Sequence, residues 1–276
     1  MASQSSPRNH RRRPRLPPTP TDEVETRDWA ELPRDLLLVV LQRLDIASIV
    51  FGAGHVCRTW RRVTREEPEL WRRIDIRSLP KPAPHGVNGS QLRALAHTAL
   101  WRSAGRCEAF WTKGITEDDY IAFFRRHTAP MLKSLRLISC EMSTVSLSID
   151  IKRFPLLEEL ELSLHSSESF DNTYMVCAAA AKACPHLKIL RLIKDAGYHW
   201  NSRVLNKDKE AMEIAKMRQL RSLQLSGNSL SNDGLAAILG GCVHLEFLDI
   251  HPCFNISMRS DSMYVRCARI RTFRHS

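Results

Sequence analysis

Three short fragments of this 276-residue chain combine cysteine with histidine, two side chains that commonly bind zinc. They are Cys184-Pro185-His186, Cys242-Val243-His244 and His251-Pro252-Cys253. In the first two, the cysteine falls three residues before the first leucine of a repeat described below, so the repeat alone explains its position. We therefore expect no metal site and no cofactor, and we expect buried thiols at these cysteines.

Other catalytic patterns are weak or missing. The run Gly52-Ala53-Gly54-His55 begins like a dinucleotide-binding loop, but Cys57 stands where the third glycine belongs. The sequence contains no G-x-S-x-G, no P-loop and no H-E-x-x-H motif. Sequence spacing does not test for a catalytic cysteine with a distant histidine, because the two residues of such a pair are far apart in the sequence and become neighbours only in the folded protein. We expect no catalytic residues, and hence a protein that is not itself an enzyme.

The composition is ordinary for a folded protein, and the chain is expected to stay inside the cell. Hydrophobic residues make up 43% and charged residues 26% of the chain. The longest apolar block, Leu36 to Leu41, is too short to span a membrane, and no secretory signal precedes it. We expect the eight cysteines to be reduced, because a chain of this size inside the cell meets reducing conditions, and none of them forms a C-x-x-C pair. We expect a nuclear or cytoplasmic location and no membrane partner.

Basic charge is concentrated at the N-terminus. The net charge is +11, and residues 1–20 contribute five arginines and no acid. Residues 1–26 are rich in proline, serine and arginine, which predicts a disordered basic tail. The cluster Arg11 to Arg15 fits a solvated tail, and an import signal or a weak polyanion contact is the alternative.

A helical segment starts at Trp29. Pro33 and Asp35 suit the first turn of a helix. The apolar residues that follow share one helical face: Leu36, Leu37, Val40, Leu41 and Leu44. Asp45 can cap a second short helix that ends near Gly52, and a third face collects Val56, Cys57, Trp60 and Val63. So short a segment carries more large apolar side chains than its own core needs, which predicts a partner.

The order of residues in this segment resembles an F-box over 27–75. The matching positions are Leu32-Pro33, Asp35-Leu36-Leu37, Val40-Leu41, Leu44, Val56-Cys57-Arg58, Trp60-Arg61 and Leu70-Trp71. The alternative is an unrelated three-helix bundle.

A leucine pattern, L-x-x-L-x-L, recurs in the second part of the chain. Its five copies begin at Leu132, Leu157, Leu187, Leu220 and Leu245. Degenerate copies are expected around Cys107 and Phe110, around Trp71, Ile74 and Ile76, and around Ile270 and Phe273. Helices are expected over 117–127, from Asp171 or Asn172 to Ala183, over 207–216 and over 231–239.

This pattern is similar to the Cys-containing type of leucine-rich repeat (LRR). Three residues after the last apolar position, such repeats favour Asn or Cys, whose polar group hydrogen-bonds to the backbone at the bend. In three units this position is filled by Cys140, Asn228 and Cys253, and in the other two by His165 and Asp195. The resemblance implies an α + α/β fold, in which a small three-helix F-box is followed by a short LRR solenoid of strand-turn-helix units over 76–276.

The whole chain resembles the plant F-box/LRR-repeat proteins. That resemblance implies a substrate receptor of an SCF-type ubiquitin ligase, which docks on a SKP-family adaptor and, through it, on cullin and RING subunits. Carried over position by position, the adaptor contacts are Leu32, Pro33, Leu36, Leu37, Val40, Leu41, Val56, Cys57, Trp60 and Trp71.

The target surface is expected on the concave face of the strands. Its side chains are the x positions of the five repeats, among which we single out Arg136, Glu161, Arg191, Gln224 and Asp249. The mixture of charges suits an unknown protein target better than a nucleic acid. The main alternative is an LRR scaffold that works outside ubiquitination, and a second is a basic nucleic-acid-associated module.

Overall fold

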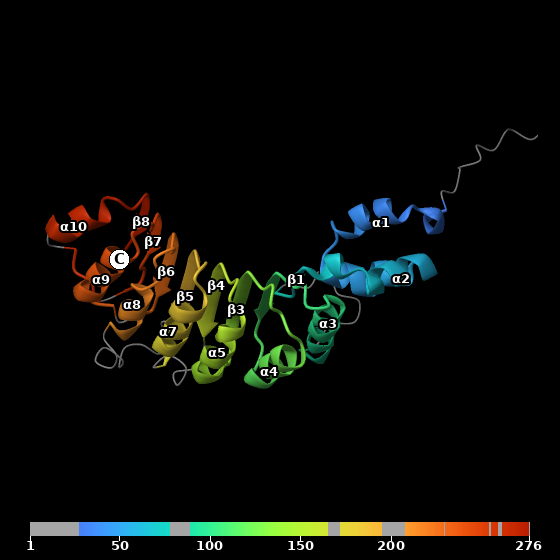
Figure 1. Ribbon diagram of the computed structural model, residues 1–276, viewed down its shortest axis with the longest axis horizontal. Coiled ribbons are helices and arrows are strands. Elements are labelled where there is room, and N and C mark those ends of the chain that lie inside the picture. Colours follow the sequence, from blue (N-terminus) through green and yellow to red (C-terminus); the bar gives the residue numbers. More distant parts are fainter. Residues whose placement is uncertain are drawn as a thin grey trace, which may run out of the picture.

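Figure 1 shows the computed structural model as a curved row of parallel strands with helices along its convex side and a separate group of helices at its N-terminal end. The structure describes residues 28–77, 89–164, 172–194, 208–228, 230–253, 255–258 and 261–275. The predicted basic tail over 1–26 lies outside these residues, as do His165 and Asp195. The predicted fold class, a small helical domain followed by a strand-and-helix solenoid, is confirmed.

The N-terminal helical segment comprises six short helices. They are η1 (Trp29–Glu31), α1 (Arg34–Leu41), η2 (Ser48–Gly52), η3 (Ala53–His55), α2 (Arg58–Glu66) and η4 (Pro68–Trp71). Asp45 caps the second of the three predicted helices, since its Oδ1 accepts a hydrogen bond from Ser48 N at 2.8 Å. That helix is a π-helical turn followed by a 3₁₀ turn rather than a regular α-helix.

Two tryptophans tie the core of this segment together. Trp71 is fully buried, and its indole N–H donates to the carbonyl of Thr64 at 3.2 Å. Trp60 donates in the same way to the carbonyl of Trp29 at 2.9 Å. Each ring therefore contributes a large apolar surface while its polar atom stays hydrogen-bonded.

The solenoid sheet has eight parallel strands in sequence order. They are β1 (Arg73–Asp75), β2 (Ala109–Lys113), β3 (Ser134–Cys140), β4 (Glu159–Leu164), β5 (Ile189–Lys194), β6 (Ser222–Ser226), β7 (Phe247–Asp249) and β8 (Thr272–Arg274). The five complete leucine copies supply β3 to β7, and the three degenerate copies supply β1, β2 and β8. The repeat therefore places every strand of the described sheet.

Helices follow the strands along the convex side (Figure 1). The four predicted helices correspond to α4 (Glu117–Arg126), α7 (Thr173–Ala183), α8 (Lys209–Ile214) and α9 (Asn232–Gly241). Thr116 starts α4 through a capping box with Asp119, as its position indicates. The sequence prediction missed α3 (Gly89–Arg102), α5 (Thr144–Asp150) with the 3₁₀ turn η5 (Ile151–Arg153), and α10 (Asp261–Cys267).

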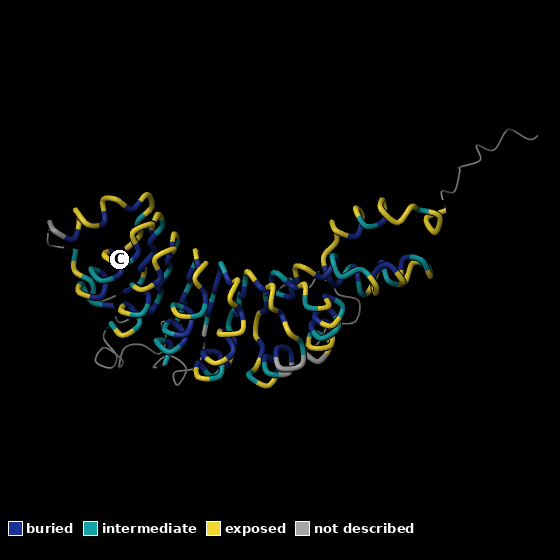
Figure 2. Tube along the Cα trace, viewed as in Figure 1, coloured by how far each residue is buried: buried dark blue, intermediate teal, exposed yellow. Residues whose placement is uncertain are grey.

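The leucines of the repeat form the core between strands and helices. Leu135, Leu160 and Leu223 are almost completely buried and stand in equivalent positions on β3, β4 and β6. Figure 2 shows this buried layer running through the arc, with intermediate and exposed residues on both sides. An aromatic cluster packs Phe110 of β2 against Phe124 of α4, and Phe124 against Phe154 directly after η5.

The residues at the Asn or Cys position behave differently from one unit to the next. Cys253 donates to the carbonyl of Leu225 at 3.6 Å, and Cys140 to that of Ile138 at 3.3 Å. The side-chain amide of Asn228 donates instead to the carboxylate of Glu210 in α8. The two cysteines thus have the expected role, a hydrogen bond to a backbone group at the bend. The side chain of Asn228 instead links the bend after β6 to helix α8.

The solenoid begins inside the segment that the sequence assigns to the F-box, 27–75. Only Arg72 separates η4 from β1. Its carbonyl accepts hydrogen bonds from Glu108 N at 2.7 Å and Ala109 N at 3.0 Å, just before β2. The helical segment and the sheet are therefore joined without an intervening linker.

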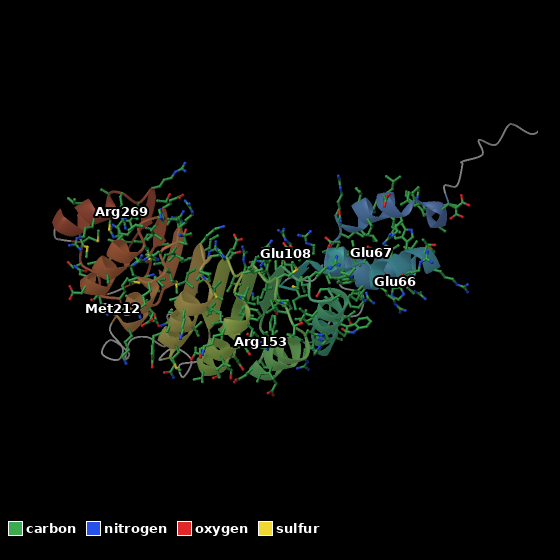
Figure 3. All side chains as sticks on the ribbon, in the orientation of Figure 1. Glu66, Glu67, Glu108, Arg153, Met212 and Arg269 are labelled. Carbon is green, nitrogen blue, oxygen red and sulfur yellow. The ribbon has the colours of Figure 1, made fainter. Side chains whose placement is uncertain are left out.

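Arg269 closes the C-terminal end of the arc (Figure 3). Its guanidinium donates to the carbonyls of Leu239, Val243 and Cys242, the last two at 3.2 Å. These carbonyls lie at the end of α9, where helical partners are lacking, so the arginine satisfies them and its charge suits the helix C-terminus. Within the described ranges, no helix is both long and apolar enough to cross a membrane.

Candidate binding surfaces

The first candidate surface is the outer face of α1. Leu36 is 55% exposed, Val39 51% and Val40 40%, and Leu44 follows one turn later. The i, i+3 and i+4 spacing of Leu36, Val39 and Val40 places them on one side of α1 (Arg34–Leu41). We call these three residues, with Leu44 in the turn after the helix, the α1 apolar face. Trp29, Phe51 and Val56 are further exposed apolar residues of the same segment. So much exposed apolar surface on one small segment is typical of a protein-binding site.

The structure divides the ten predicted adaptor contacts by burial. Exposed side chains are Pro33, Leu36, Val40 and Val56, and partly buried ones are Leu32 and Cys57. Leu37, Leu41, Trp60 and Trp71 belong to the segment's own core. These four side chains support the surface rather than form it, because almost none of their area is left to touch a partner. Val39 is exposed on the α1 apolar face but is missing from the predicted set.

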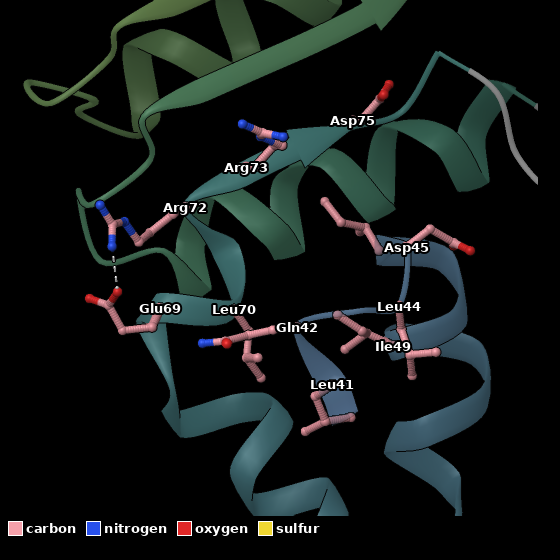
Figure 4. Close-up of a pocket in the computed structure, with 11 residues that line it drawn as sticks. Leu41, Gln42, Leu44, Asp45, Ile49, Glu69, Leu70, Arg72, Arg73 and Asp75 are labelled. Carbon is pink, nitrogen blue, oxygen red and sulfur yellow. Dashed lines mark hydrogen bonds and ion pairs between the residues drawn. The ribbon is translucent and has the colours of Figure 1, made fainter. Parts of the chain in front are cut away.

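A hollow of about 330 Å³ lies where the helical segment meets the sheet (Figure 4). Its apolar wall comes from the end of α1 and the turns after it, including Leu41, Leu44 and Ile49. The opposite wall carries Arg73 and Asp75 of β1. The hollow continues the α1 apolar face at Leu44 towards the concave side of the sheet.

The second candidate surface crosses the concave face. The five predicted target residues occupy one register row, in which Arg136 pairs with Glu161, Glu161 with Arg191, Arg191 with Gln224, and Gln224 with Asp249. Asp75 of β1 begins the same row, Trp111 of β2 follows it beside Arg136, and Arg274 of β8 ends it beside Asp249. The repeat thus brings all five residues together in one line.

The centre of this row is an ion-pair cluster around Glu159. One carboxylate oxygen of Glu159 accepts from Arg136 at 2.8 Å and from Arg191 at 2.6 Å, and the other accepts from the hydroxyl of Ser134 at 2.7 Å. Glu161 lies 3.4 Å from Arg191 and 3.6 Å from Arg136. Within this cluster, the two arginines and the two glutamates therefore neutralise each other.

Trp111 forms the N-terminal border of the cluster. Its indole N–H donates to Ser134 Oγ at 2.8 Å, and the guanidinium of Arg136 stacks 4.4 Å from its ring centroid. Arg77 approaches the same ring at 4.8 Å while it pairs with Asp75 at 2.8 Å. Sequence reasoning counted Glu159 among the x positions of the concave face without singling it out, and it missed Trp111, although the register position of Trp111 could have identified it.

Burial and hydrogen bonding act in opposite directions on the pKa of Glu159. Burial raises this pKa, whereas hydrogen bonds from Ser134, Arg191 and Arg136 lower it and prevail, so the net pKa lies below the ordinary 4.5. The carboxylate therefore stays charged at neutral pH and holds the two arginines in place.

The other end of the row is less charged. Gln224 is partly exposed, and Asp249 is buried, with its Oδ1 accepting from the backbone N–H of His251 at 3.1 Å. Of the five predicted target residues, Asp249 thus has the least surface to offer a partner. Phe247 of β7 is partly exposed and adds apolar surface beside this end, and Ile189 of β5, also partly exposed, lies next to Glu159.

The cysteine-histidine fragments do not assemble a metal site. In each, the cysteine is buried and the histidine is exposed, so the two point to different sides. Cys184 donates to the carbonyl of Phe154 at 3.5 Å and Cys242 to that of Ile214 at 3.3 Å, each in the preceding repeat. Within the described part of the chain, no group of three metal-binding side chains comes together.

Burial also keeps these thiols protonated. It raises the pKa of Cys184, Cys242 and Cys253 to about 11 each, and that of Cys107 to about 12. Since the thiolate is the nucleophile and the metal ligand, these four cysteines are suited to packing rather than to chemistry.

Comparisons with known proteins agree with this architecture. An F-box-like family model matches residues 29–77. The chain is 37% identical over 268 residues to "Putative F-box/LRR-repeat protein 22" of Arabidopsis thaliana, which covers 93% of this chain and 80% of that protein. It is 35% identical over 281 residues to "F-box protein SKIP19" of the same plant, covering 100% and 82%. "F-box protein FBW2", also from Arabidopsis, is 25% identical over 241 residues, covering 86% and 72%.

Proposed function

Because this chain belongs to the F-box/LRR-repeat family, we propose that it is the substrate receptor of an SCF-type E3 ubiquitin ligase. In this role the F-box binds a SKP-family adaptor, and the adaptor links it to cullin and RING subunits. The observation that carries the proposal is the α1 apolar face, where Leu36, Val39 and Val40 are exposed on one side of an eight-residue helix.

The α1 apolar face supports adaptor docking because the opposite side of α1 is already used. Leu37 and Leu41 fill the core of the F-box, so the helix is held in position before a partner arrives. A preordered apolar face loses little conformational entropy on binding. We propose that the adaptor covers Leu36, Val39 and Val40. It also covers Pro33 and Val56, two further predicted contacts that are exposed.

The LRR arc is proposed to hold the protein target. Its strands present Arg136, Glu161, Arg191, Gln224 and Asp249 in one row, and the pairing around Glu159 fixes the two arginines without added ligand. A rigid row of this kind raises the effective concentration of a bound target near the ubiquitin-carrying enzyme. The chain itself is then a non-catalytic subunit. We expect it to work in the nucleus or the cytoplasm.

The test is reconstitution of the purified full chain with a recombinant SKP-family adaptor. Co-elution as a stable complex in size-exclusion chromatography supports the proposal, and addition of cullin and RING subunits extends the complex. A chain that stays separate from the adaptor at micromolar concentrations contradicts it and favours an LRR scaffold outside ubiquitination. Affinity purification with mass spectrometry, with and without proteasome inhibition, then identifies targets.

A further inference from the structure

A second hollow, of about 610 Å³, lies between the end of the F-box and the first helices of the solenoid. Arg65 and Glu66 line it from the end of α2, where Figure 3 labels Glu66, and Trp101 and Arg102 line it from the end of α3. His127, directly after α4, completes it. Its volume falls within the range of small-molecule sites.

Two arginines in this hollow lack acidic partners within the described ranges. Among the residues that the structure describes, neither Arg65 nor Arg102 forms an ion pair, and Glu66 pairs with neither. Burial lowers the pKa of Arg102, and the nearby charge of Arg65 lowers it further, with no described carboxylate acting in the opposite direction. Two close cations of this kind favour binding of an anion.

Arg102 also has an unsatisfied donor. Its Nε is buried and finds no acceptor in the described structure, while its guanidinium stacks 5.1 Å from the ring centroid of Trp71. A buried donor without a partner is costly. No hydrogen bond from the Arg102 side chain to a described acceptor is found either, so the guanidinium that lines the hollow keeps its donors available to an anion. The stacking on Trp71 fixes the plane of the guanidinium, which suits phosphate recognition.

Histidines and an exposed tryptophan add to the site. Nδ1 of His97 lies 3.3 Å from Nε2 of His127, so the two imidazoles form a polar side of the hollow. The side chain of Trp101 is 69% exposed, which is unusual for so large an apolar ring. At the border of a cationic hollow, it offers a stacking surface to a flat group that carries the anion.

We propose that this hollow binds a phosphate monoester on an aromatic body, with Arg65 and Arg102 holding the phosphate and Trp101 stacking on the ring. The site is separate from both the α1 apolar face and the concave row. It therefore does not depend on the ligase proposal, and the experiment needs only the full chain without adaptor.

Phenyl phosphate is the first probe, with inorganic phosphate and uncharged phenol as comparisons, each titrated against the full chain by ligand-observed NMR. Phenyl phosphate is expected to bind more tightly than either comparison. Arg65→Gln is expected to weaken it on the order of tenfold, because a charge-assisted hydrogen bond is lost. Trp101→Ala is expected to reduce its affinity to that of inorganic phosphate, and to leave inorganic phosphate unaffected.

Arg58→Gln is the matched control, since Arg58 is an exposed arginine of the same helix as Arg65, at its first residue and outside the hollow. It is expected to bind phenyl phosphate like the wild type. Arg65 and Trp101 are both exposed, so their replacement keeps the fold intact, which circular dichroism verifies. Absence of phenyl phosphate binding at millimolar concentration, or equal binding by all variants, would overturn the proposal.

The same titration distinguishes the two sources of such a ligand. A phosphotyrosine pentapeptide that binds at least as tightly as phenyl phosphate, with the same sensitivity to Arg65→Gln, indicates a peptide source. Binding of phenyl phosphate with exclusion of the pentapeptide indicates a free small molecule. Both results support the site, and in either case Arg65→Gln and Trp101→Ala are expected to weaken the binding of phenyl phosphate as stated above.

Discussion

Leu36 and Leu37 are neighbours in α1, yet the side chain of Leu36 is 55% exposed and that of Leu37 is fully buried. The hydrophobic pattern of the sequence treats the two alike. Their different environments separate the residues that offer surface to a partner from those that hold the helix in place.

This pair supplies the first prediction. Leu37→Ala is expected to lower the free energy of unfolding of the F-box by about 2–5 kcal/mol, because it leaves a cavity in the core. Leu36→Ala is expected to leave stability nearly unchanged and to weaken adaptor binding on the order of tenfold. Urea unfolding and adaptor titration measure the two effects. If Leu36→Ala binds adaptor like the wild type, the α1 apolar face is not the docking surface.

The residues just before α1 supply the second prediction. Leu32 is partly buried against the core, and Pro33 is exposed at the N-cap of α1. A Leu32→Ala, Pro33→Ala double variant is expected to lose adaptor binding while the LRR sheet stays folded. Pull-down and far-ultraviolet circular dichroism test this together. Equal recovery of adaptor by the variant and the wild type would count against it.

The third prediction concerns Glu159 and pH. Its pKa lies below 4.5, so its contribution to stability is complete above pH 4.5 and is lost as the pH falls through its lowered native value. Glu159→Gln is expected to cost about 1–3 kcal/mol at pH 7, because two arginines lose the negative charge that they share. The difference between variant and wild type is expected to shrink below pH 4.5, as measured by urea unfolding across pH.

Glu158→Gln is the matched control for this experiment. Glu158 pairs with Lys188 at 2.7 Å, but both side chains are more than 40% exposed. Such exposed pairs contribute less than about 1 kcal/mol. A cost for Glu158→Gln equal to that of Glu159→Gln would show that the buried cluster has no special role.

The fourth prediction uses two adjacent glycines at the end of α9. A Cβ on Gly241 would lie 1.9 Å from the carbonyl oxygen of Ala215, whereas a Cβ on Gly240 would meet nothing within 4 Å. Gly241→Ala is expected to cost about 1–3 kcal/mol or more, because α8 and α9 must move apart. Gly240→Ala is expected to be neutral or to stabilise by about 0.5–1 kcal/mol. Thermal unfolding of both variants provides the comparison, and a similar loss in each would refute it.

The fifth prediction concerns thiol reactivity. Seven of the eight cysteines are buried, and Cys57 alone is partly exposed. Burial raises the pKa of Cys177 and Cys267 as well as that of the repeat cysteines, which leaves little thiolate near neutral pH. A disulfide reagent is expected to modify one thiol quickly in the native chain and all eight in denaturant. Cys57→Ser is expected to abolish the fast phase, and a persistent fast phase would place the reactive thiol elsewhere.

The strands could be predicted from sequence because each repeats one short pattern. The leucines of L-x-x-L-x-L face the core in every unit, so even the copies around Phe110 and Phe273 are recognisable. The convex helices carry no such fixed pattern. Helix α5 has only seven residues and mixes serine with apolar residues, and neither α3 nor α10 follows from leucine spacing.

The candidate sites were predictable only in part. The register row of Arg136, Glu161 and Arg191 follows directly from the repeat. The cluster around Glu159 does not, because Arg136 and Arg191 reach it diagonally across strands. Which apolar side chains of α1 are buried likewise depends on how α1 packs against α2. The spacing of apolar residues in α1 does not specify that packing.

The single residue between η4 and β1 has a geometric consequence. Because the Arg72 carbonyl is hydrogen-bonded just before β2, and a helix and a strand lie directly on either side of this residue, the connection leaves the α1 apolar face little freedom to turn relative to the concave row. In the proposed ligase, a bound target would be held at a fixed distance from the ubiquitin-carrying enzyme and in a fixed orientation. Such a receptor would choose lysines by their position on the cargo, so two proteins that bind equally well could be modified at very different rates.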